Sequence, residues 1–328
     1  MLYIEPESTD ASFHFAAEDY CMKRFCGESV WMLWRADKCA MLGSNQIADA
    51  EIDLGAAAAA GVRVVRRASG GGTIFTDLGT LLYTVILPYN GGDVKRLERV
   101  FVIEPMVRAL NDMRIDAKIE GRNDILLDGK KISGLAQHLS RNCLCTHGSL
   151  LYDTDLDTLS RVLRPDEEKI KSKALRSVSA RVANIASYME KPLTLREFWN
   201  DLKQNIFKTQ DLREYKLTEE DISEIQKIRL EKYASDSWTF GKTPRFSFHN
   251  KKRFPMGGVE VFLDVEDGVV SACEIRGDFL GVTPIRALEE LLEARPYRMD
   301  AIEKTLKNID LTPYLGGVTK EQLLTCLF

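Results

Sequence analysis

Three absences narrow what this 328-residue sequence can encode. No apolar run reaches the roughly 20 residues that a helix needs to cross a bilayer. The first residues, MLYIEPESTDASF, lack the basic and apolar regions of a secretory signal. Lysine and arginine (45) do not outnumber aspartate and glutamate (49), so no basic excess is present to displace the counterions of a nucleic acid. We therefore expect neither a membrane protein nor a general nucleic-acid binder.

The few cysteines and histidines form no recognisable metal or disulfide framework. The seven cysteines are scattered and no pair has zinc spacing, which favours a reduced, cytoplasmic protein. His14, His138 and His249 have no cysteine or carboxylate at catalytic spacing. The chain also lacks a Gly-x-Ser-x-Gly elbow, a metalloprotease motif, a Walker loop and a GxGxxG sequence. The common signatures of hydrolases and dinucleotide-binding enzymes are thus missing.

What remains is the composition of a globular protein, with 45% hydrophobic and 29% charged residues, and a length typical of two domains. The patterns predict a hairpin of strands 30–34 and 39–43, a helix over 49–60 and a long helix over 93–113 that Pro105 kinks. Residues 165–191 form a polar segment. The pattern resets near residues 235–244, and strands followed by helices after that point predict a smaller α+β domain.

A glycine-rich turn at residues 66–80, RRASGGGTIFTDLGT, stands out between two apolar runs. Three consecutive glycines suit a place where a ligand approaches bare backbone, or where φ must be positive. Backbone N–H groups in such a turn bind anions, and Arg66 or Arg67 would add planar cationic donors. Two interpretations stay open: a phosphate or carboxylate site, and a tight hairpin with exposed arginines.

A second candidate stretch is 121–137, GRNDILLDGKKISGLAQ, in which Asp128-Gly129 predicts a two-residue hairpin turn. By this register Asp124 and Lys131 lie nearly opposite each other. They form either an exposed ion pair, worth under ~1 kcal/mol, or a carboxylate for a metal and a lysine for a developing phosphate charge. Further along, His147 is a ligand contact or a structural histidine.

Four segments in order, RRASGGGTIFTDLGT, GRNDILLDGKKISGLAQ, THGSLL and SVSARVANI, make the chain resemble the lipoate–protein ligase A family. The resemblance begins at Trp34-Arg35 and Gly43 through Gln46 and continues to WTFGKTP and GDF, so it covers essentially the whole chain. It implies an α+β fold. Residues 1–242 would form a biotin/lipoate ligase-type catalytic domain with mixed β-sheets flanked by helices, and residues 243–328 a small C-terminal α+β accessory domain.

The resemblance also implies an ATP-dependent reaction in two steps. Lipoate and MgATP give lipoyl-AMP and pyrophosphate, and the lipoyl group then passes to one lysine of a carrier protein. The implied carriers are lipoyl domains of 2-oxoacid dehydrogenase E2 subunits and the glycine-cleavage H protein. We expect a cytoplasmic enzyme that is a monomer and uses ATP and Mg²⁺ with lipoate or octanoate.

The family's motifs assign roles to residues of this chain. Lys131 matches the essential lysine, and Asp124 would hold Mg²⁺. The residues implied for ATP or the adenylate are Arg67, Gly72, Thr73, Ile74, Phe75, Asn123, Asp124, Lys131, Lys173 and Arg181. Those implied for lipoate are Arg67, Ser69, Gly70, Gly71, Thr76, Lys131, Gly134, Ala136, His147 and Gly148. Residues 173–184 match the loop that closes over the adenylate.

One departure and three rival functions stay open. The family usually has a histidine and an asparagine where this chain has Thr76 and Thr80, which leaves the choice between lipoate and octanoate undecided. An octanoyl or lipoyl transferase would use a cysteine nucleophile, and Cys143 and Cys145 alternate on one predicted strand, where core packing is the alternative. A biotin ligase lacks support because its Gly-Arg-Gly-Arg type loop is absent. A degenerate carrier-protein binder without activity is the third rival.

Overall fold

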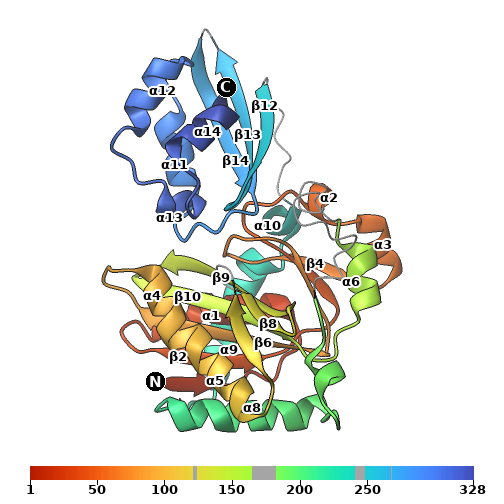
Figure 1. Cartoon of the computed structure of the whole chain (residues 1–328). Coiled ribbons are helices and arrows are strands. Elements are labelled where there is room, and N and C mark those ends of the chain that lie inside the picture. The colour runs from red at the N-terminus through yellow and green to blue at the C-terminus, as the bar shows by residue number, and fades with distance from the viewer. Residues whose placement is uncertain (121–123, 165–181, 241–247, 267) are drawn as a thin grey trace.

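The computed structural model describes residues 1–120, 124–164, 182–240, 248–266 and 268–328. Figure 1 shows a large part, built on an eight-stranded sheet, and a small part above it that is formed by the C-terminal strands and helices. The α+β class predicted from the sequence is confirmed. The predicted domain boundary at 242/243 falls at residues 241–247, outside the described residues.

The large sheet has the strand order β11-β1-β2-β6-β10-β9-β8-β7. β1 pairs in parallel with β2 and β11, and the other pairings are antiparallel, so the sheet is mixed. Its strands are β1 (Leu2–Ile4), β2 (Val30–Trp34), β6 (Thr80–Pro88), β7 (Ala117–Glu120), β8 (Asp124–Leu127), β9 (Lys130–Ser140), β10 (Cys143–Leu151) and β11 (Arg213–Glu214).

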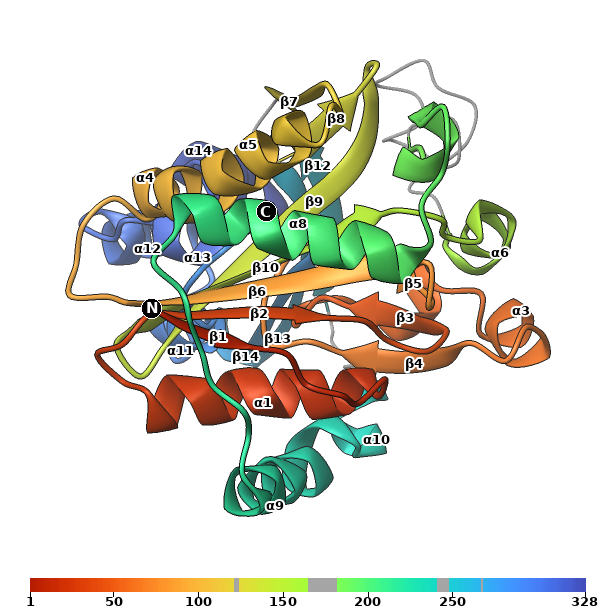
Figure 2. The ribbon, with the colours of Figure 1, turned by 90° about the horizontal axis from the view of Figure 1, so that it is seen from below.

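Helices cover both faces of this sheet, as Figure 2 shows. Alternate side chains of β2 and β6 supply the two cores, because successive residues of a strand point to opposite faces. One core includes Trp31, Leu33 and Tyr83 under α5 (Glu104–Asp112) and α8 (Leu195–Thr209). The other includes Met32 and Trp34 under α1 (Ala11–Arg24) and α9 (Glu219–Ile228). Burial on both faces fixes the register of the central strands.

A second, three-stranded sheet of the large part consists of β4 (Arg63–Arg66), β3 (Cys39–Leu42) and β5 (Ile74–Thr76), in that order. The predicted hairpin of residues 30–34 and 39–43 is therefore wrong, because β2 pairs with β1 and β6 whereas β3 pairs with β4 and β5. Both segments are strands that are buried throughout, and such a pattern does not reveal which strand is the partner.

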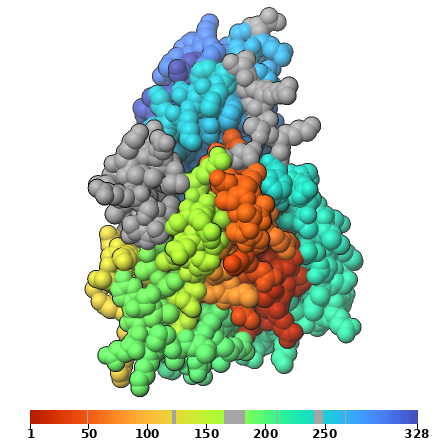
Figure 3. Space-filling view, turned by 90° about the vertical axis from the view of Figure 1, so that its right-hand side faces the viewer, coloured from red at the N-terminus to blue at the C-terminus, as the bar shows by residue number. Residues whose placement is uncertain are grey.

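The predicted helix over 49–60 is two short helices, α2 (Ala48–Glu51) and α3 (Leu54–Ala59). Ile52 between them is extended and bridges to Leu163, and the Asp53 carboxylate caps α3 by accepting from the Ala56 N–H at 2.9 Å. In Figure 3 the orange α2–α3 segment lies beside the yellow-green α6 (Leu156–Val162), with which α3 shares a core.

The helix predicted over 93–113 is interrupted by a π turn, Arg99–Ile103, between α4 (Val94–Glu98) and α5. Pro105 lies in the first turn of α5, directly after the π turn, and its nitrogen cannot donate to the preceding helical turn; the irregularity takes the form of the π turn. The remaining helical segments of the large part are Ile185–Tyr188, the π turn Arg229–Tyr233 and α10 (Asp236–Phe240). No helix among the described residues is long and apolar enough to span a membrane.

The small part packs four helices on one antiparallel sheet, β12-β13-β14. Its strands are β12 (Phe248–Phe254), β13 (Gly257–Glu266) and β14 (Val269–Gly277), and its helices are α11 (Arg286–Leu292), α12 (Met299–Leu306), α13 (Thr312–Leu315) and α14 (Lys320–Leu327). The last two helices were not predicted, since they are short and their apolar residues suit either helix or loop.

Backbone hydrogen bonds join the small part to the glycine turn of the large part. The Gly71 N–H donates to the Phe279 carbonyl at 3.1 Å, and the Leu139 N–H at the end of β9 donates to the Val282 carbonyl at 2.6 Å. A third bond runs from Gly277 N–H to the Asn45 carbonyl at 2.9 Å. Residues 277–282 thus lie across the stretch that the sequence singled out.

Candidate active site

The candidate site is built on one face of the β9–β10 pair. Three cross-strand pairs face α1 in succession: Gly134 with Ser149, Ala136 with His147, and His138 with Cys145. They share a face because they occur at every second position of an antiparallel ladder. We call these six residues the β9–β10 row. It brings residues predicted for the site onto one surface, with the glycine turn above its middle.

Arg67 holds the glycine turn together from inside. Its guanidinium donates to the Gly70 and Gly72 carbonyls at 2.7 and 2.8 Å, to the Met41 carbonyl at 2.8 Å and to the Ser69 hydroxyl at 3.0 Å. The side chain is only 4% exposed, and burial, together with the neighbouring Arg66, lowers its pKa to about 10. The predicted ATP-contacting arginine therefore supports the turn in this structure, and its donors are already engaged.

Arg66 is buried as well, and it fixes neighbouring loops. Its guanidinium donates to the Gly43 and Gln46 carbonyls, both at 2.7 Å, and to the Thr239 carbonyl of α10 at 2.8 Å. The interpretation of the turn as a hairpin with exposed arginines is wrong, because neither guanidinium reaches the surface. Buried arginines that bond to carbonyls make the turn rigid, and a rigid turn holds its N–H groups in place.

The glycines of the turn are required by different neighbours. Gly71 has φ of 86°, and a Cβ there would lie 2.7 Å from the Leu280 Cδ2 atom, so a side chain is excluded on both counts. A Cβ on Gly70 would lie 2.9 Å from the Phe279 carbonyl oxygen. At Gly72, no atom of the described residues lies within 4 Å of that position. The small part therefore covers Gly70 and Gly71, whereas no described residue covers Gly72 in the same way.

A buried hydrogen-bond chain connects the turn to α1. The Ser69 hydroxyl lies 2.6 Å from His147 Nε2, and His147 Nδ1 lies 2.9 Å from the Glu18 carboxylate. Thr84 donates to the same carboxylate at 2.7 Å, and Trp34 donates to Thr84 at 3.0 Å. Burial alone would raise the pKa of Glu18, but His147 and the hydrogen bonds prevail and lower it.

Glu18 was missed by the sequence analysis. Its helix shows no motif, and the contact with His147 joins residues 129 positions apart. The only available signal was a carboxylate on an otherwise apolar face, because glutamate is rarely buried without a partner. His147, predicted for lipoate, lies at the centre of this chain.

Lys131 lies at the other end of the β9–β10 row. Its Nζ is 2.7 Å from the Asp124 carboxylate, and both side chains are partly exposed. The two-residue turn places Lys131 opposite Leu126, and a register shift beyond that pair places Asp124 opposite Gly134, so the predicted register, with Asp124 nearly opposite Lys131, is wrong. The ion pair forms because the lysine side chain crosses above Gly134, where a Cβ would lie 2.6 Å from Nζ.

The backbone of Lys131 is tied to the segment that follows residue 181. The Ala183 N–H donates to the Lys131 carbonyl at 3.1 Å, and Val182 bridges to the same strand. The Asn184 side chain holds Thr154 by two hydrogen bonds, at 3.0 and 2.8 Å. Residues 182–184, the end of the predicted adenylate loop, are thus anchored beside Lys131. Asn123, Lys173 and Arg181 lie outside the described residues.

Several predicted site residues lie away from the row. Thr76 pairs with Cys39, at the end of β3 away from the turn, and Phe75 is buried in the core shared with α6. Gly148 faces the opposite side of β10, where it leaves room for the ring of Tyr83. These positions form the scaffold around the site.

Thr73, which immediately precedes β5, connects the glycine turn to the loop that contains Gln46. The Thr73 hydroxyl donates to the Gln46 side-chain oxygen at 2.8 Å, and the Gly43 N–H donates to the same oxygen at 2.8 Å. Ile74 pairs with Met41 on β3. Gln46 therefore positions both flanks of the turn.

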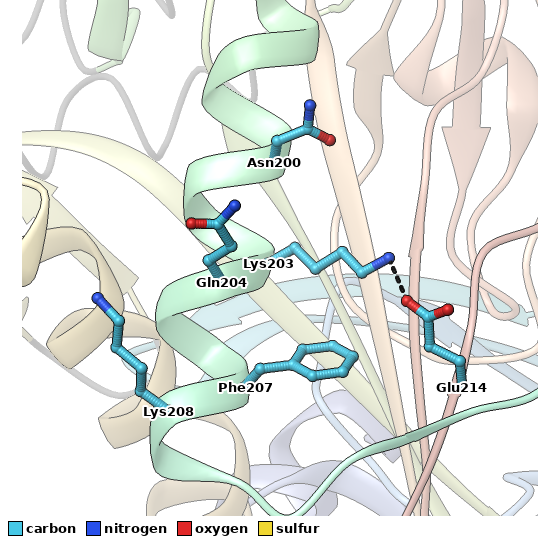
Figure 4. Close-up of a pocket in the computed structure, with 6 residues that line it drawn as sticks. All are labelled: Asn200, Lys203, Gln204, Phe207, Lys208 and Glu214. Carbon is cyan, nitrogen blue, oxygen red and sulfur yellow. Dashed lines mark ion pairs between the residues drawn. The ribbon is translucent and has the colours of Figure 1, made fainter.

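A shallow pocket on α8 is unrelated to the row, because the large sheet separates the two. Lys203, Phe207 and Glu214 are among its lining residues (Figure 4). Lys203 Nζ already pairs with Glu214 at 2.7 Å and lies 4.6 Å from the centre of the Tyr3 ring. Lys203 therefore has a structural role on α8, since its ammonium group pairs with Glu214 and packs against Tyr3.

Comparison with known proteins agrees with the motifs. Residues 10–207 match the family model described as the lipoyl protein ligase A/B catalytic domain, and residues 243–327 match the bacterial lipoate protein ligase C-terminus. Lipoate-protein ligase LplJ of Bacillus subtilis is 34% identical over 333 residues, which cover 100% of each chain.

Two solved structures are similar over about three quarters of the chain. A bipartite lipoate protein ligase, studied with its E2 lipoyl domain from Thermoplasma acidophilum, has a TM-score of 0.66 at 27% identity and covers 75% of this chain and 98% of its own. A lipoate-protein ligase A bound with ATP has a TM-score of 0.63 at 26% identity and covers 73% of this chain and 97% of its own.

Proposed function

The chain belongs to the lipoyl protein ligase A/B family, and we propose on that premise that it is an ATP-dependent lipoate–protein ligase. The first step joins the lipoate carboxylate to the α-phosphorus of ATP and releases pyrophosphate. In the second step a carrier lysine attacks the acyl carbonyl and AMP leaves. Neither step needs a covalent bond to the enzyme.

One observation carries the proposal most directly: Lys131 Nζ lies above Gly134, at the end of a row whose middle lies under the glycine turn. Adenylation brings two anions, a carboxylate and a phosphate, into contact against their repulsion. A fixed ammonium group at that point stabilises the charge that develops in the transition state. We propose that Lys131 supplies it and that the acid lies along the row toward His147.

The backbone of the turn would serve the nucleotide. Among the described residues none crowds Gly72, and Arg67 holds the Gly72 carbonyl, so an approaching phosphate would meet a rigid backbone. Gly71 N–H is engaged with Phe279, so any use of that group by a nucleotide requires residues 277–282 to move away. This requirement links the first step to the position of the small part.

Asp124 fits a magnesium ion that accompanies ATP. Mg²⁺ in nucleotide sites is usually held by one or two carboxylates together with substrate phosphates, and Asp124 offers one partly exposed carboxylate beside Lys131. The ion would neutralise phosphate charge during pyrophosphate release. Asp124 would keep the ion close to Lys131.

The burial of the two candidate cysteines argues against the rival function, an acyl transferase with a cysteine nucleophile. Cys143 and Cys145 are both fully buried, and burial raises the pKa of both thiols, so the nucleophilic thiolate is disfavoured. The core packing predicted for these two residues is confirmed. The acyl acceptors that we propose are lipoyl-domain proteins of the E2 or glycine-cleavage H type, and the compartment is the cytoplasm.

Mass spectrometry of an acceptor tests this function. A purified lipoyl domain incubated with the enzyme, lipoate and ATP should gain one lipoyl group, and a domain with arginine at the acceptor lysine should gain none. Parallel reactions with octanoate decide between the two acids. Transfer that proceeds without ATP from an acylated donor protein would contradict the ligase assignment.

A further inference from the structure

A second set of chemically active side chains occupies the inner end of the β9–β10 row. Glu18 of α1 and Cys145 and His147 of β10 each offer one ligand atom, and these three atoms lie within 4.8 Å of one another. All three residues are buried. A carboxylate oxygen, a thiol and an imidazole nitrogen are the donor types that bind zinc in proteins.

His138 provides an independent observation at the same place. It is the cross-strand partner of Cys145, so its side chain lies on the same face of the sheet, and its ring centre is 6.4 Å from that of His147. The side chain is 8% exposed, yet neither ring nitrogen has a hydrogen-bond partner in the described part of the chain. A buried polar group without a partner is unfavourable, and a bound ligand would remove that cost.

We propose that Glu18, His138, Cys145 and His147 form a binding site for a zinc-like transition-metal ion. The set contains two nitrogen donors, one sulfur and one oxygen, which suits a four-coordinate site. On binding, the Cys145 thiol releases its proton to solvent and the thiolate coordinates the metal, so charge and protons balance. Glu18, Cys145 and His147 already place ligand atoms within 4.8 Å of one another, and His138 lies on the same face of the sheet.

The spacing of the four ligands explains why sequence motifs did not reveal this site. Two of them come from positions 138 and 145 on facing strands, one from position 147 and one from a helix that begins at Ala11. Motif searches look for paired cysteines or histidines within one loop. Here the ladder register and the packing of α1 bring the four together.

Metal binding would act on the glycine turn through His147. That imidazole bonds to Ser69 at 2.6 Å, and Ser69 accepts from Arg67. Coordination through His147 Nε2 would replace the bond to Ser69, and it would place a cation beside His147, toward which the proposed acid extends. This consequence rests on the proposed function, and the binding measurement below does not.

Cobalt(II) titration of the full-length, metal-free protein tests the site. Co²⁺ replaces Zn²⁺ in tetrahedral sites and reports a thiolate ligand by a charge-transfer band in the near ultraviolet. The parent for all variants carries Cys26→Ser, because Cys26 is the one exposed cysteine and would bind metal adventitiously. The parent should show the band and saturate at one Co²⁺ per chain, and Zn²⁺ should displace the cobalt.

Two variants and one control identify the ligands. Cys145→Ser should abolish the thiolate band, and His138→Gln should weaken binding at least tenfold. Cys143→Ser, a change of the same kind two residues away on β10, should leave the band and affinity unchanged. Circular dichroism shows which variants are folded, and His138→Gln decides the matter should Cys145→Ser not fold. A parent without the band, or a folded Cys145→Ser or His138→Gln protein that binds as the parent does, would overturn the proposal.

Discussion

Among single residues, Lys131 should matter to chemistry and not to folding. Its side chain is 41% exposed and packs no core, and its ion pair with Asp124 is of the partly exposed kind that contributes under ~1 kcal/mol to stability. Lys131→Ala should therefore lower lipoate-dependent adenylation by about a hundredfold or more, in the range found when one transition-state donor is removed. Steady-state exchange kinetics measure the loss. The matched control is Lys130→Ala, an exposed neighbour, which should keep its activity. A folded Lys131→Ala enzyme with near-normal activity would remove the assignment.

A second prediction for a single residue concerns Gly134, beneath the Lys131 side chain. A Cβ there would lie 2.6 Å from Lys131 Nζ and 2.7 Å from Cε, so Gly134→Ala must push the lysine side chain aside. Because the displaced atoms end a flexible chain, the variant should melt within a few degrees of the wild type. Its adenylation rate should nevertheless fall at least tenfold. Gly55→Ala on α3, where the nearest atom is 3.5 Å away, is the control. Equal rates for Gly134→Ala and wild type would show that the position of the ammonium group is not critical.

The residues of the site were predictable only in part. Lys131, Ser69 and His147 came from motifs that are contiguous in sequence, and the structure brings them to one face. Glu18 and His138 were not assigned, since their places depend on the packing of α1 and on a cross-strand register. Thr76 and Gly148 were assigned by motif but lie away from the row: Thr76 is in the other sheet, opposite Cys39, and Gly148 faces the opposite side of β10 because side chains alternate along a strand.

At the scale of elements, the buried His14 of α1 should make the free energy of unfolding depend on pH in the acid range. His14 is fully buried against the Trp34 ring, and burial lowers its pKa to about 4, although Ser8, Glu18 and Asp10 act in the opposite direction. A lowered pKa means that the unfolded chain takes up the proton first as the pH falls below about 6.5. Protonation therefore favours the unfolded state, so the free energy of unfolding is highest near pH 7 and falls as the pH is lowered toward 4.

Urea unfolding at pH 7 and pH 5 measures this effect. For a shift from 6.5 to about 4, linkage gives a loss of about 2 kcal/mol between these two pH values for this group. His14→Phe retains an aromatic ring beside Trp34 but cannot titrate. Its free energy of unfolding should therefore fall by about 2 kcal/mol less than that of the wild type over the same interval. Identical pH dependence in the two proteins would mean that His14 is not buried in its neutral form.

Elements were easier to predict than their partners. The strands at 30–34, 124–127 and 143–151 follow from apolar runs and from the Asp128-Gly129 turn, whose two residues both have positive φ. The assignment of β2 and β3 to different sheets does not follow from such runs, because every position in both is buried. The register shift between β8 and β9 likewise leaves no local signal, and it decides which residue lies opposite Asp124.

At the scale of the whole molecule, the small part should move when the adenylate forms. Phe279 accepts from Gly71 N–H and Leu280 lies over Gly71, so these two residues and a nucleotide would compete for the same space above the turn. The carrier lysine must also reach the acyl group once water has been excluded from it. The hinge for this movement is expected within residues 235–244, where the sequence pattern resets between the two parts. Residues 236–240 are helical, and Arg66 donates to the Trp238 and Thr239 carbonyls within them; residues 241–244 lie outside the described residues.

Small-angle scattering with and without a non-hydrolysable lipoyl-adenylate measures this movement. The radius of gyration and the scattering profile should change on saturation with the analogue. The loop predicted at 173–184 should become more resistant to trypsin in the same step. Superimposable curves at confirmed saturation would show that the two parts keep their arrangement.

The central claim is that this chain activates a free acid with ATP at Lys131 and the glycine turn. Exchange of labelled pyrophosphate into ATP measures that step alone, without a carrier protein. We predict exchange that requires lipoate or octanoate, requires Mg²⁺ and is lost in Lys131→Ala but kept in Lys130→Ala. A folded wild-type protein that shows no acid-dependent exchange with either acid would contradict the account, because transferases and pure binders give that result.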